Sequence, residues 1–372
     1  MNNGTARSAW KAQLGKLPWL LLIPLGLYLP DLAAKYPEWI EQYYSNGVYP
    51  HISGMIAKLT SRANFSLAEV LLYALAASFA ITVLVLLLGL VFRKIRVVRL
   101  FSFLFSLGIT VGVLLNLFYV MWGFNYARPA LSVTMGLNVE QRPVEELESL
   151  CETLAENAAA LRAQVSENDD GVFVLPQGYR AEFKKIPAAY EALNGNLHLF
   201  LSDATVAKGV YYSQGLSYAG IAGIYVPFTA EPNVNVDQPA LLLLSSAAHE
   251  TAHFMGIARE DEANFMAYLA CISSDDPAIA YSGVMLALIH CSNKLYDADY
   301  DKYAAIYASY SDAMKRDLAD YNTYWDAFEG PIEETVNEVN DNYLKFNKQE
   351  TGVQSYGMVV DLLLAYSARY GV

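Results

Sequence analysis

Two histidines and a glutamate are spaced in this chain as a metal-dependent enzyme would need them. The stretch that begins at His249 reads HETAHFMGIAREDEAN. His249 and His253 are four residues apart, so on a helix both imidazoles project from one face, which suits two ligands of a tetrahedral zinc ion. Glu250 lies beside the first histidine, where it could reach a water molecule activated by the metal without binding the metal itself. We therefore expect one Zn²⁺ per chain, with Glu250 as the general base.

A catalytic zinc needs a third protein ligand, and an acidic run follows the second histidine. Glu260 is the first choice, because Asn264 lies four residues later on the same helical face and could hydrogen-bond a zinc ligand from behind. Glu262 is the competing choice, since it lies in the same helical turn. A hydrolytic transition state would also need a hydrogen-bond donor near the metal. The candidates for this donor are Arg259, His290, Tyr343 and Tyr356.

The pattern H-E-x-x-H followed by E-x-x-A-N resembles that of the gluzincins, a class of zinc metallopeptidases in which two helices supply two histidines and one glutamate. The resemblance implies a zincin-like domain that hydrolyses peptide bonds. One departure is the spacing, because Glu260 follows His253 by only seven residues, whereas many gluzincins place the third ligand well beyond that. Over nearly all of its length the chain also resembles a bacterial membrane-protein family known as domain of unknown function 3810. That resemblance is carried by the three apolar N-terminal segments, by GIAGIYVPFTAEPNVN ahead of the histidines and by SYGMVVDLLLAY near the end.

Charge is distributed unevenly between the two parts of the chain. Of its 372 residues 54% are hydrophobic and only 17% are charged, which excludes a disordered protein. Residues 1–123 carry a net charge of +6 and the remainder a net charge of −19. Such an acidic remainder is unsuited to nucleic acid, whose phosphates require clustered lysine and arginine. The basic residues stand beside long apolar runs, which indicates a membrane.

Three segments, at about 17–34, 65–92 and 100–124, are long and apolar enough to span a bilayer. Lys and Arg gather before the first segment and in the loop at 93–99, so the positive-inside rule places the N-terminus and that loop in the cytoplasm. We expect residues 1–124 to be a multi-pass anchor in the bacterial cytoplasmic membrane, with its first segment uncleaved. Residues 125–372 would then form an extracytoplasmic domain.

The outer domain is predicted to be mainly α with a small β element. Apolar periodicity and Gly or Pro boundaries predict helices at 144–168, from 239 to about 256, from 260 onward, and at 278–292, 297–328, 331–347 and 355–370. Short strands are expected at 197–202 and 223–228. The peptidase resemblance suggests that the second strand pairs with an extended substrate. The three cysteines, Cys151, Cys271 and Cys291, are interpreted as small buried hydrophobic residues.

A membrane-anchored zinc metallopeptidase is the function favoured by these features, with the lipid bilayer and a peptide or envelope-protein substrate as partners. The alternative is a non-catalytic, zinc-stabilised sensor or scaffold of the cell envelope. Glu250 argues against that alternative, because a structural zinc site needs no base and usually closes with a fourth protein ligand. An intramembrane protease is disfavoured by the REDE run at 259–262, whose burial in lipid would be costly.

Overall fold

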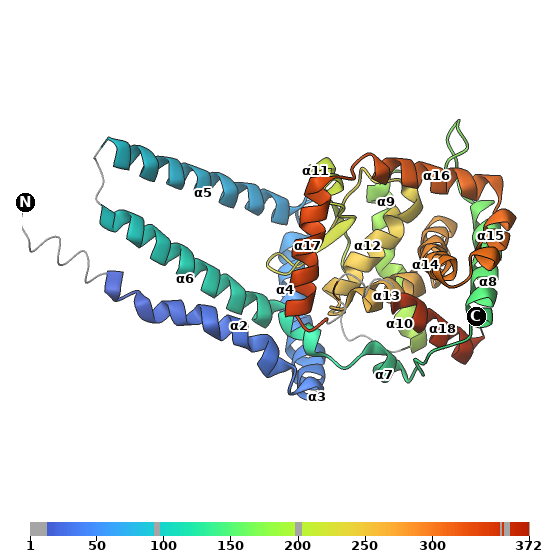
Figure 1. Cartoon of the computed structure of the whole chain (residues 1–372), viewed down its shortest axis with the longest axis horizontal. Coiled ribbons are helices and arrows are strands. Elements are labelled where there is room, and N and C mark those ends of the chain that lie inside the picture. Colours follow the sequence, from blue (N-terminus) through green and yellow to red (C-terminus); the bar gives the residue numbers. More distant parts are fainter. Residues whose placement is uncertain (1–12, 93–96, 198–202, 350–351, 353–357, 372) are drawn as a thin grey trace, which may run out of the picture.

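A helical arm and a globular body make up the molecule (Figure 1). The computed structural model describes residues 13–92, 97–197, 203–349, 352 and 358–371. The arm and its junction with the body contain η1 (Leu17–Leu21), α2 (Leu22–Ala33), α3 (Pro37–Trp39), η2 (Ile40–Val48), α4 (Tyr49–Thr60), α5 (Leu67–Val91), α6 (Val97–Met121) and η3 (Gly123–Ala127). The body contains α7 (Leu131–Met135), α8 (Val144–Arg162), α9 (Tyr179–Phe183), α10 (Ile186–Leu197), α11 (Ser213–Tyr218), α12 (Ala240–Phe254), α13 (Glu260–Ile272), α14 (Pro277–Ala298), α15 (Tyr300–Ser309), α16 (Asp312–Asp326), α17 (Pro331–Phe346), α18 (Val359–Tyr370) and three short strands.

Two helices of the arm, α5 and α6, are long and apolar enough to cross a membrane. No residue of α5 is buried inside the protein, which suits a helix whose apolar side chains face lipid. The first predicted span is less simple than its sequence indicates. A helical stretch at 17–33 is followed by a second one at 37–60, and the two are bent from each other by 96°. They amount to a third candidate span only if the bent pair is taken as one span. The start of the chain and the basic loop at 93–96, which carry much of the orientation argument, lie outside the described residues.

The sheet has three short strands, β1 (Lys208–Gly209), β2 (Gly223–Val226) and β3 (Glu231–Val234). Their order is β1-β3-β2, with β1 parallel and β2 antiparallel to β3, so β2 is an edge strand. The predicted strand at 223–228 is thus confirmed, although it ends at Val226. At the other predicted strand, Leu197 is the last residue of α10, and residues 198–202 lie outside the described part of the chain.

The first turn of α5 is bonded to this sheet. Glu231 of β3 accepts hydrogen bonds from the backbone N–H of Leu67 (3.3 Å) and of Ala68 (2.8 Å). A carboxylate at a helix N-terminus satisfies free N–H groups and favours the helix dipole. Lys208 of β1 pairs with the same carboxylate and donates to the carbonyl of Thr60 at 2.8 Å. One end of α5 is therefore anchored to the body by buried polar contacts.

The core of the body is built from α12, α13 and α14, which pack on one another, with α8 against α14. The run ALLLLSSAA makes the first half of α12 apolar on every side, and nearly all of the helix is buried. The mainly helical body with a small sheet is therefore as predicted. The helix expected at 297–328 is instead divided into α15 and α16, because Ser311 caps a new helix by accepting from Met314 N–H. All three cysteines are buried and free.

A buried ion pair ties α16 to α8 and to the loop that follows α8. Asp317 accepts hydrogen bonds from Arg162 Nε at 2.6 Å, from the Tyr281 hydroxyl at 2.7 Å and from the backbone N–H of Phe173 at 2.8 Å. Arg162 also donates to the carbonyl of Gly171 at 2.8 Å. The positive and negative groups of this cluster are thus paired within the chain.

Candidate metal centre

The turn between α12 and α13 brings the two ends of the sequence motif together. After α12 the backbone of Gly256 takes a φ of +88°, a left-handed conformation that favours glycine, and the chain reverses. A Cβ at this position would lie 3.2 Å from the ring of Tyr49, so space as well as conformation favours glycine. The chain then enters α13 at Glu260. His249 and His253, from the last two turns of α12, therefore face the first residue of the next helix.

His249, His253 and Glu260 form a cluster that could hold a metal ion. Their ligand atoms all lie within 4.8 Å of one another. Glu260 Oε2 is 3.2 Å from His249 Nε2 and 3.5 Å from His253 Nε2. Two imidazoles and one carboxylate are the ligand set of many catalytic zinc sites, which leave further positions open to water and substrate.

Both imidazoles are held by their other nitrogen. His253 Nδ1 donates to the carbonyl oxygen of Ile257 at 2.7 Å, and His249 Nδ1 lies 2.8 Å from the side-chain oxygen of Asn264. With the proton on Nδ1, each neutral ring turns the lone pair of Nε2 toward Glu260. In that state three electron-rich atoms converge and could bind a cation, whereas a histidine protonated on both nitrogens would donate from Nε2 to Glu260. These outer hydrogen bonds also orient metal-ligating histidines in known sites.

The pKa shifts of His253 and Glu260 indicate that the cluster attracts positive charge. Burial is the largest single influence on the pKa of His253 and lowers it, but the charge and hydrogen bond of Glu260, the charge of Glu250 and the carbonyl of Ile257 together raise it to about 9. Burial by itself raises the pKa of Glu260, but the two histidines outweigh burial and hold it well below its usual value. The cluster therefore attracts positive charge, which a metal ion would supply in place of protons.

Glu250 lies next to the cluster and not within it. Its side chain is buried, and its Oε2 atom has no hydrogen-bond partner among the described residues. Burial raises its pKa to about 7, and the two neighbouring histidines oppose that rise. The side chain packs on β2 so closely that a Cβ at Gly223 would lie 2.6 Å from it. A buried carboxylate with one free oxygen is suited to accepting a proton.

Glu262, the competing candidate for the third ligand, is engaged elsewhere. It accepts hydrogen bonds from the backbone N–H of Leu131 at 2.7 Å and from Arg259 at 3.1 Å. Arg259 also donates to the carbonyl of Arg128 at 2.9 Å, so these two side chains hold the start of α7. Glu260, and not Glu262, lies with the histidines.

Two of the four candidate donors lie near the cluster. His290 of α14 has its pKa lowered to about 4 by burial and by nearby His249, so the ring is neutral at pH 7. Tyr343 of α17 has its pKa raised, first by burial and then by the negative charge of Glu260, and its hydroxyl lies 3.1 Å from that of Tyr126. Arg259 is held by its contacts to α7, and Tyr356 lies outside the described residues.

Several aromatic residues around the cluster were not predicted from the sequence. Trp122, just beyond α6, donates from Nε1 to the carbonyl of His253 at 2.9 Å, and its ring meets the imidazole edge-on at 5.8 Å. Tyr49 donates to the carbonyl of Phe254 at 2.7 Å, and Tyr225 of β2 packs on Trp122. No local pattern signals these contacts, because they join residues more than 100 positions apart. They place the cluster at the end of the body that adjoins α6.

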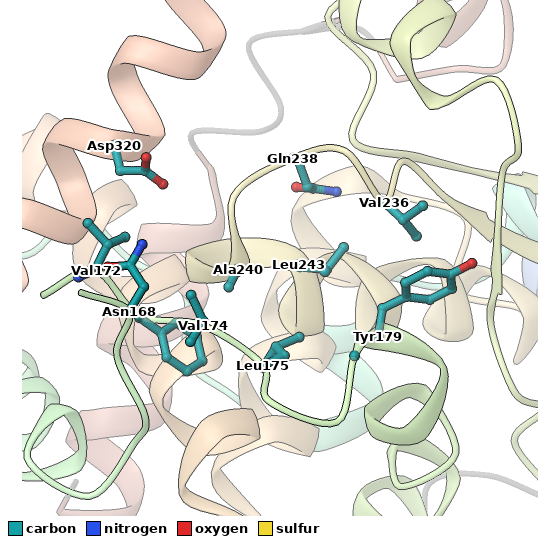
Figure 2. Close-up of a pocket in the computed structure, with 12 residues that line it drawn as sticks. Asn168, Val172, Val174, Leu175, Tyr179, Val236, Gln238, Ala240, Leu243 and Asp320 are labelled. Carbon is teal, nitrogen blue, oxygen red and sulfur yellow. Dashed lines mark hydrogen bonds between the residues drawn. The ribbon is translucent and has the colours of Figure 1, made fainter. Parts of the chain in front are cut away.

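Figure 2 shows a separate pocket, of about 280 Å³, beside the start of α12. Gln238, Ala240 and Leu243 form one side of it, and Tyr179 and Asp320 reach it from α9 and α16. None of the cluster residues lines it, so it is not part of the candidate metal centre.

Comparison with curated proteins and with solved structures finds no match to this chain. A family model does match residues 44–364, which cover the second apolar segment, the third and nearly all of the body. The match includes all three residues of the cluster. The chain therefore belongs to the family described as "Protein of unknown function (DUF3810)".

Proposed function

We propose that this protein is a membrane-anchored, gluzincin-type zinc metallopeptidase. His249, His253 and Glu260 would hold one Zn²⁺, with Asn264 orienting His249, and Glu250 would act as the general base. The observation that carries the proposal is the convergence of two imidazole nitrogens and a carboxylate oxygen beside a buried carboxylate, one oxygen of which has no hydrogen-bond partner among the described residues. A purely structural zinc site would have no use for that carboxylate.

Zinc would supply Lewis-acid catalysis, because it polarises a substrate carbonyl and lowers the pKa of a water molecule. Glu250 takes one proton from the attacking water as the new C–O bond forms, and returns it to the leaving nitrogen as the C–N bond breaks. His290 of α14 and Tyr343 of α17 are each influenced by a charge of the cluster, and we propose them as the candidate donors to the carbonyl oxygen. β2 is the edge strand beside Glu250, so an extended substrate can add to it through main-chain hydrogen bonds.

The body would act outside the cytoplasmic membrane, as the excess of Lys and Arg at the start of the chain and near 93–99 indicates. A C-terminal alkaline phosphatase fusion should therefore be active. An inactive fusion, with a cytoplasmic reporter active at the same position, would reverse this orientation.

Three substitutions test the chemistry. Glu250→Gln should retain one zinc per chain and lose about 10²–10⁴-fold in turnover, because the amide keeps its size but cannot accept a proton. Glu260→Gln should lose zinc, since an anionic ligand is removed. Glu262→Gln is the matched control, two residues away on the same helix, and should keep both zinc and turnover. Zinc content is measured by elemental analysis, and turnover on a substrate found by comparing membrane proteomes with and without the enzyme.

Two results would contradict the assignment. Full turnover in Glu250→Gln would exclude the mechanism, and zinc loss in that variant would make Glu250 a ligand. If the wild-type protein holds zinc but leaves every membrane protein intact, the non-catalytic sensor or scaffold becomes the better account.

A further inference from the structure

Helix α17 carries an apolar stripe that has little cover from the rest of the protein. The stripe recurs at positions i, i+4, i+7, i+11 and i+14, which lie on one face of a helix. Its members are Ile332, Val336, Val339, Tyr343 and Phe346. Ile332 and Val339 are 60% and 63% exposed, although both are aliphatic. The outward face of the same helix is polar, with Glu334, Glu338, Asn342 and Lys345. A continuous exposed stripe of this kind marks an interaction surface.

The C-terminal end of α17 is fixed to the ends of two arm helices. Asn347 accepts a hydrogen bond from the Tyr119 hydroxyl of α6 at 3.0 Å. Lys348 forms an ion pair with Asp31 of α2 at 2.5 Å. Near its other end, the Glu333 side chain packs on Gly220, just ahead of β2. Figure 1 shows the result: α17 runs crosswise to the arm, between the body end of α5 and that of α6.

Two exposed tyrosines in the loop after β1, Tyr211 and Tyr212, are bonded to the body end of α5. The Glu69 carboxylate, in the first turn of α5, accepts from the backbone N–H of Tyr211 at 2.7 Å and of Tyr212 at 2.8 Å. The Tyr211 side chain is 96% exposed. Tyrosine and tryptophan gather where a span leaves the hydrocarbon, because their rings suit the boundary between lipid and water. These residues therefore mark the plane in which α5 leaves the membrane.

We propose that α17 is an interfacial helix that lies on the bilayer with its apolar stripe in the lipid. The helix lies across the ends of the two long spans, and its orientation there is that of a monotopic amphipathic helix. The ring of Tyr343, a member of the stripe, meets that of Phe118 near the end of α6 at 6.3 Å. The stripe thus continues the apolar surface of the arm. Because the arm is expected to lie in lipid, we infer that lipid also covers the stripe.

The position of α17 also defines a substrate class, an extension that rests on the proposed peptidase function. The hydroxyl of Tyr343, a member of the stripe, lies 3.1 Å from that of Tyr126, whose ring is 5.2 Å from the ring of Trp122. Trp122 in turn donates to the carbonyl of His253. A helix that rests on lipid therefore holds the metal cluster at the membrane surface. The substrate would be a polypeptide held at that surface, by its own membrane span or by a lipid anchor, and not a freely diffusing peptide.

Fluorescence quenching in the full-length protein tests the docking without any assay of activity. The three native cysteines are buried, so single cysteines placed at Val339 and at Glu338 can be labelled with an environment-sensitive dye in phospholipid nanodiscs. The two positions are neighbours in the chain but point about 100° apart around the helix. The dye at Val339→Cys should be quenched by spin-labelled lipid and protected from iodide, and the dye at Glu338→Cys should show the reverse.

Strong iodide quenching at both positions would overturn the docking. Protection at Val339→Cys from both quenchers would also overturn it, because a second copy or another protein would then cover the stripe.

A second measurement tests the substrate class. The wild-type protein should cleave a vesicle-anchored peptide several-fold faster than the same peptide free in solution, and Val339→Glu should remove that preference while zinc content stays unchanged. Equal rates on both peptides, unaffected by Val339→Glu, would refute the substrate class. Cleavage of neither peptide, together with the expected quenching, would count against the peptidase function and leave the docking in place.

Discussion

Two of the buried clusters of charged side chains in the body differ in how each charge is balanced by its neighbours. In the Arg162–Asp317 cluster every partner is within the chain, since both carboxylate oxygens accept hydrogen bonds and the opposite charge is a guanidinium. In the His249–His253–Glu260 cluster a carboxylate faces two imidazoles, whose charge depends on bound protons, and one oxygen of neighbouring Glu250 has no partner in the described part of the chain.

We interpret the first cluster as structural, and the second is the one for which we propose a function. A buried charge is tolerated when it is paired and hydrogen-bonded, and is costly when it is not. The first cluster meets that condition with the residues of the chain alone. The second meets it only with added positive charge, from protons on the histidines or from the metal ion that we propose it binds.

The largest effect on stability is expected from breaking the complete cluster. Asp317→Ala removes the buried counter-ion of Arg162, leaves it only the half-exposed Glu167, and also removes the acceptor for Tyr281 and Phe173, so we expect the free energy of unfolding to fall by about 3–5 kcal/mol. Chemical denaturation in detergent measures this change. Asp320→Ala, one helical turn away at an exposed position, is the control and should stay within about 0.5 kcal/mol of wild type. A fall below 1 kcal/mol in Asp317→Ala would remove the structural role given to this cluster.

Removal of zinc should have a somewhat smaller effect. A ligand at about 100–1,000 times its Kd stabilises the folded state by about 2.7–4.1 kcal/mol, so a strong chelator should lower stability by that amount. His249→Ala/His253→Ala should contain no zinc and should not respond to the chelator. His51→Ala, which alters an exposed histidine of α4, should behave as wild type. If the double variant still responds to the chelator, the metal is bound elsewhere.

The smallest of these effects is expected at Asn264, which touches the cluster only through His249. Asn264→Ala should weaken zinc binding about 10–100-fold, or about 1.4–2.7 kcal/mol, because the imidazole loses the partner that orients it. Competition against a zinc-binding dye measures the affinity. Asn342→Ala, at an exposed site of α17, is the control. An unchanged affinity in Asn264→Ala would show that the 2.8 Å contact does not orient the ring.

The parts of the site that lie close together in the chain were predictable from sequence. His249, Glu250 and His253 share one helix, and helical periodicity alone places them on adjacent faces. The choice between Glu260 and Glu262 was open, because both lie in one helical turn. Only the backbone N–H of Leu131, which comes from a distant segment, shows where the Glu262 carboxylate is engaged.

The parts that depend on distant contacts were not predictable in this way. No local sequence pattern predicts that Trp122 contacts His253 or that Gly223 lies against Glu250. The bend after Ala33 could not be predicted, because a hydropathy profile shows how long an apolar segment is but not whether its helix changes direction. The break between α15 and α16 is a different case, since Ser311 is a favoured N-cap residue and the signal was present in the sequence.

The short turn at Gly256 has a consequence for how the protein reaches its folded state. All three cluster residues lie between His249 and Glu260, so assembling them closes only a short loop, and the entropy lost on closure grows with loop length. The cluster can form as soon as α12 and α13 pair, before α6 or α17 joins them from distant parts of the chain. A zinc ion captured at that stage would act as a nucleus for the body. We therefore expect zinc supply to govern the rate of folding as well as the chemistry of the finished protein, a dependence that refolding rates measured with and without the metal would reveal.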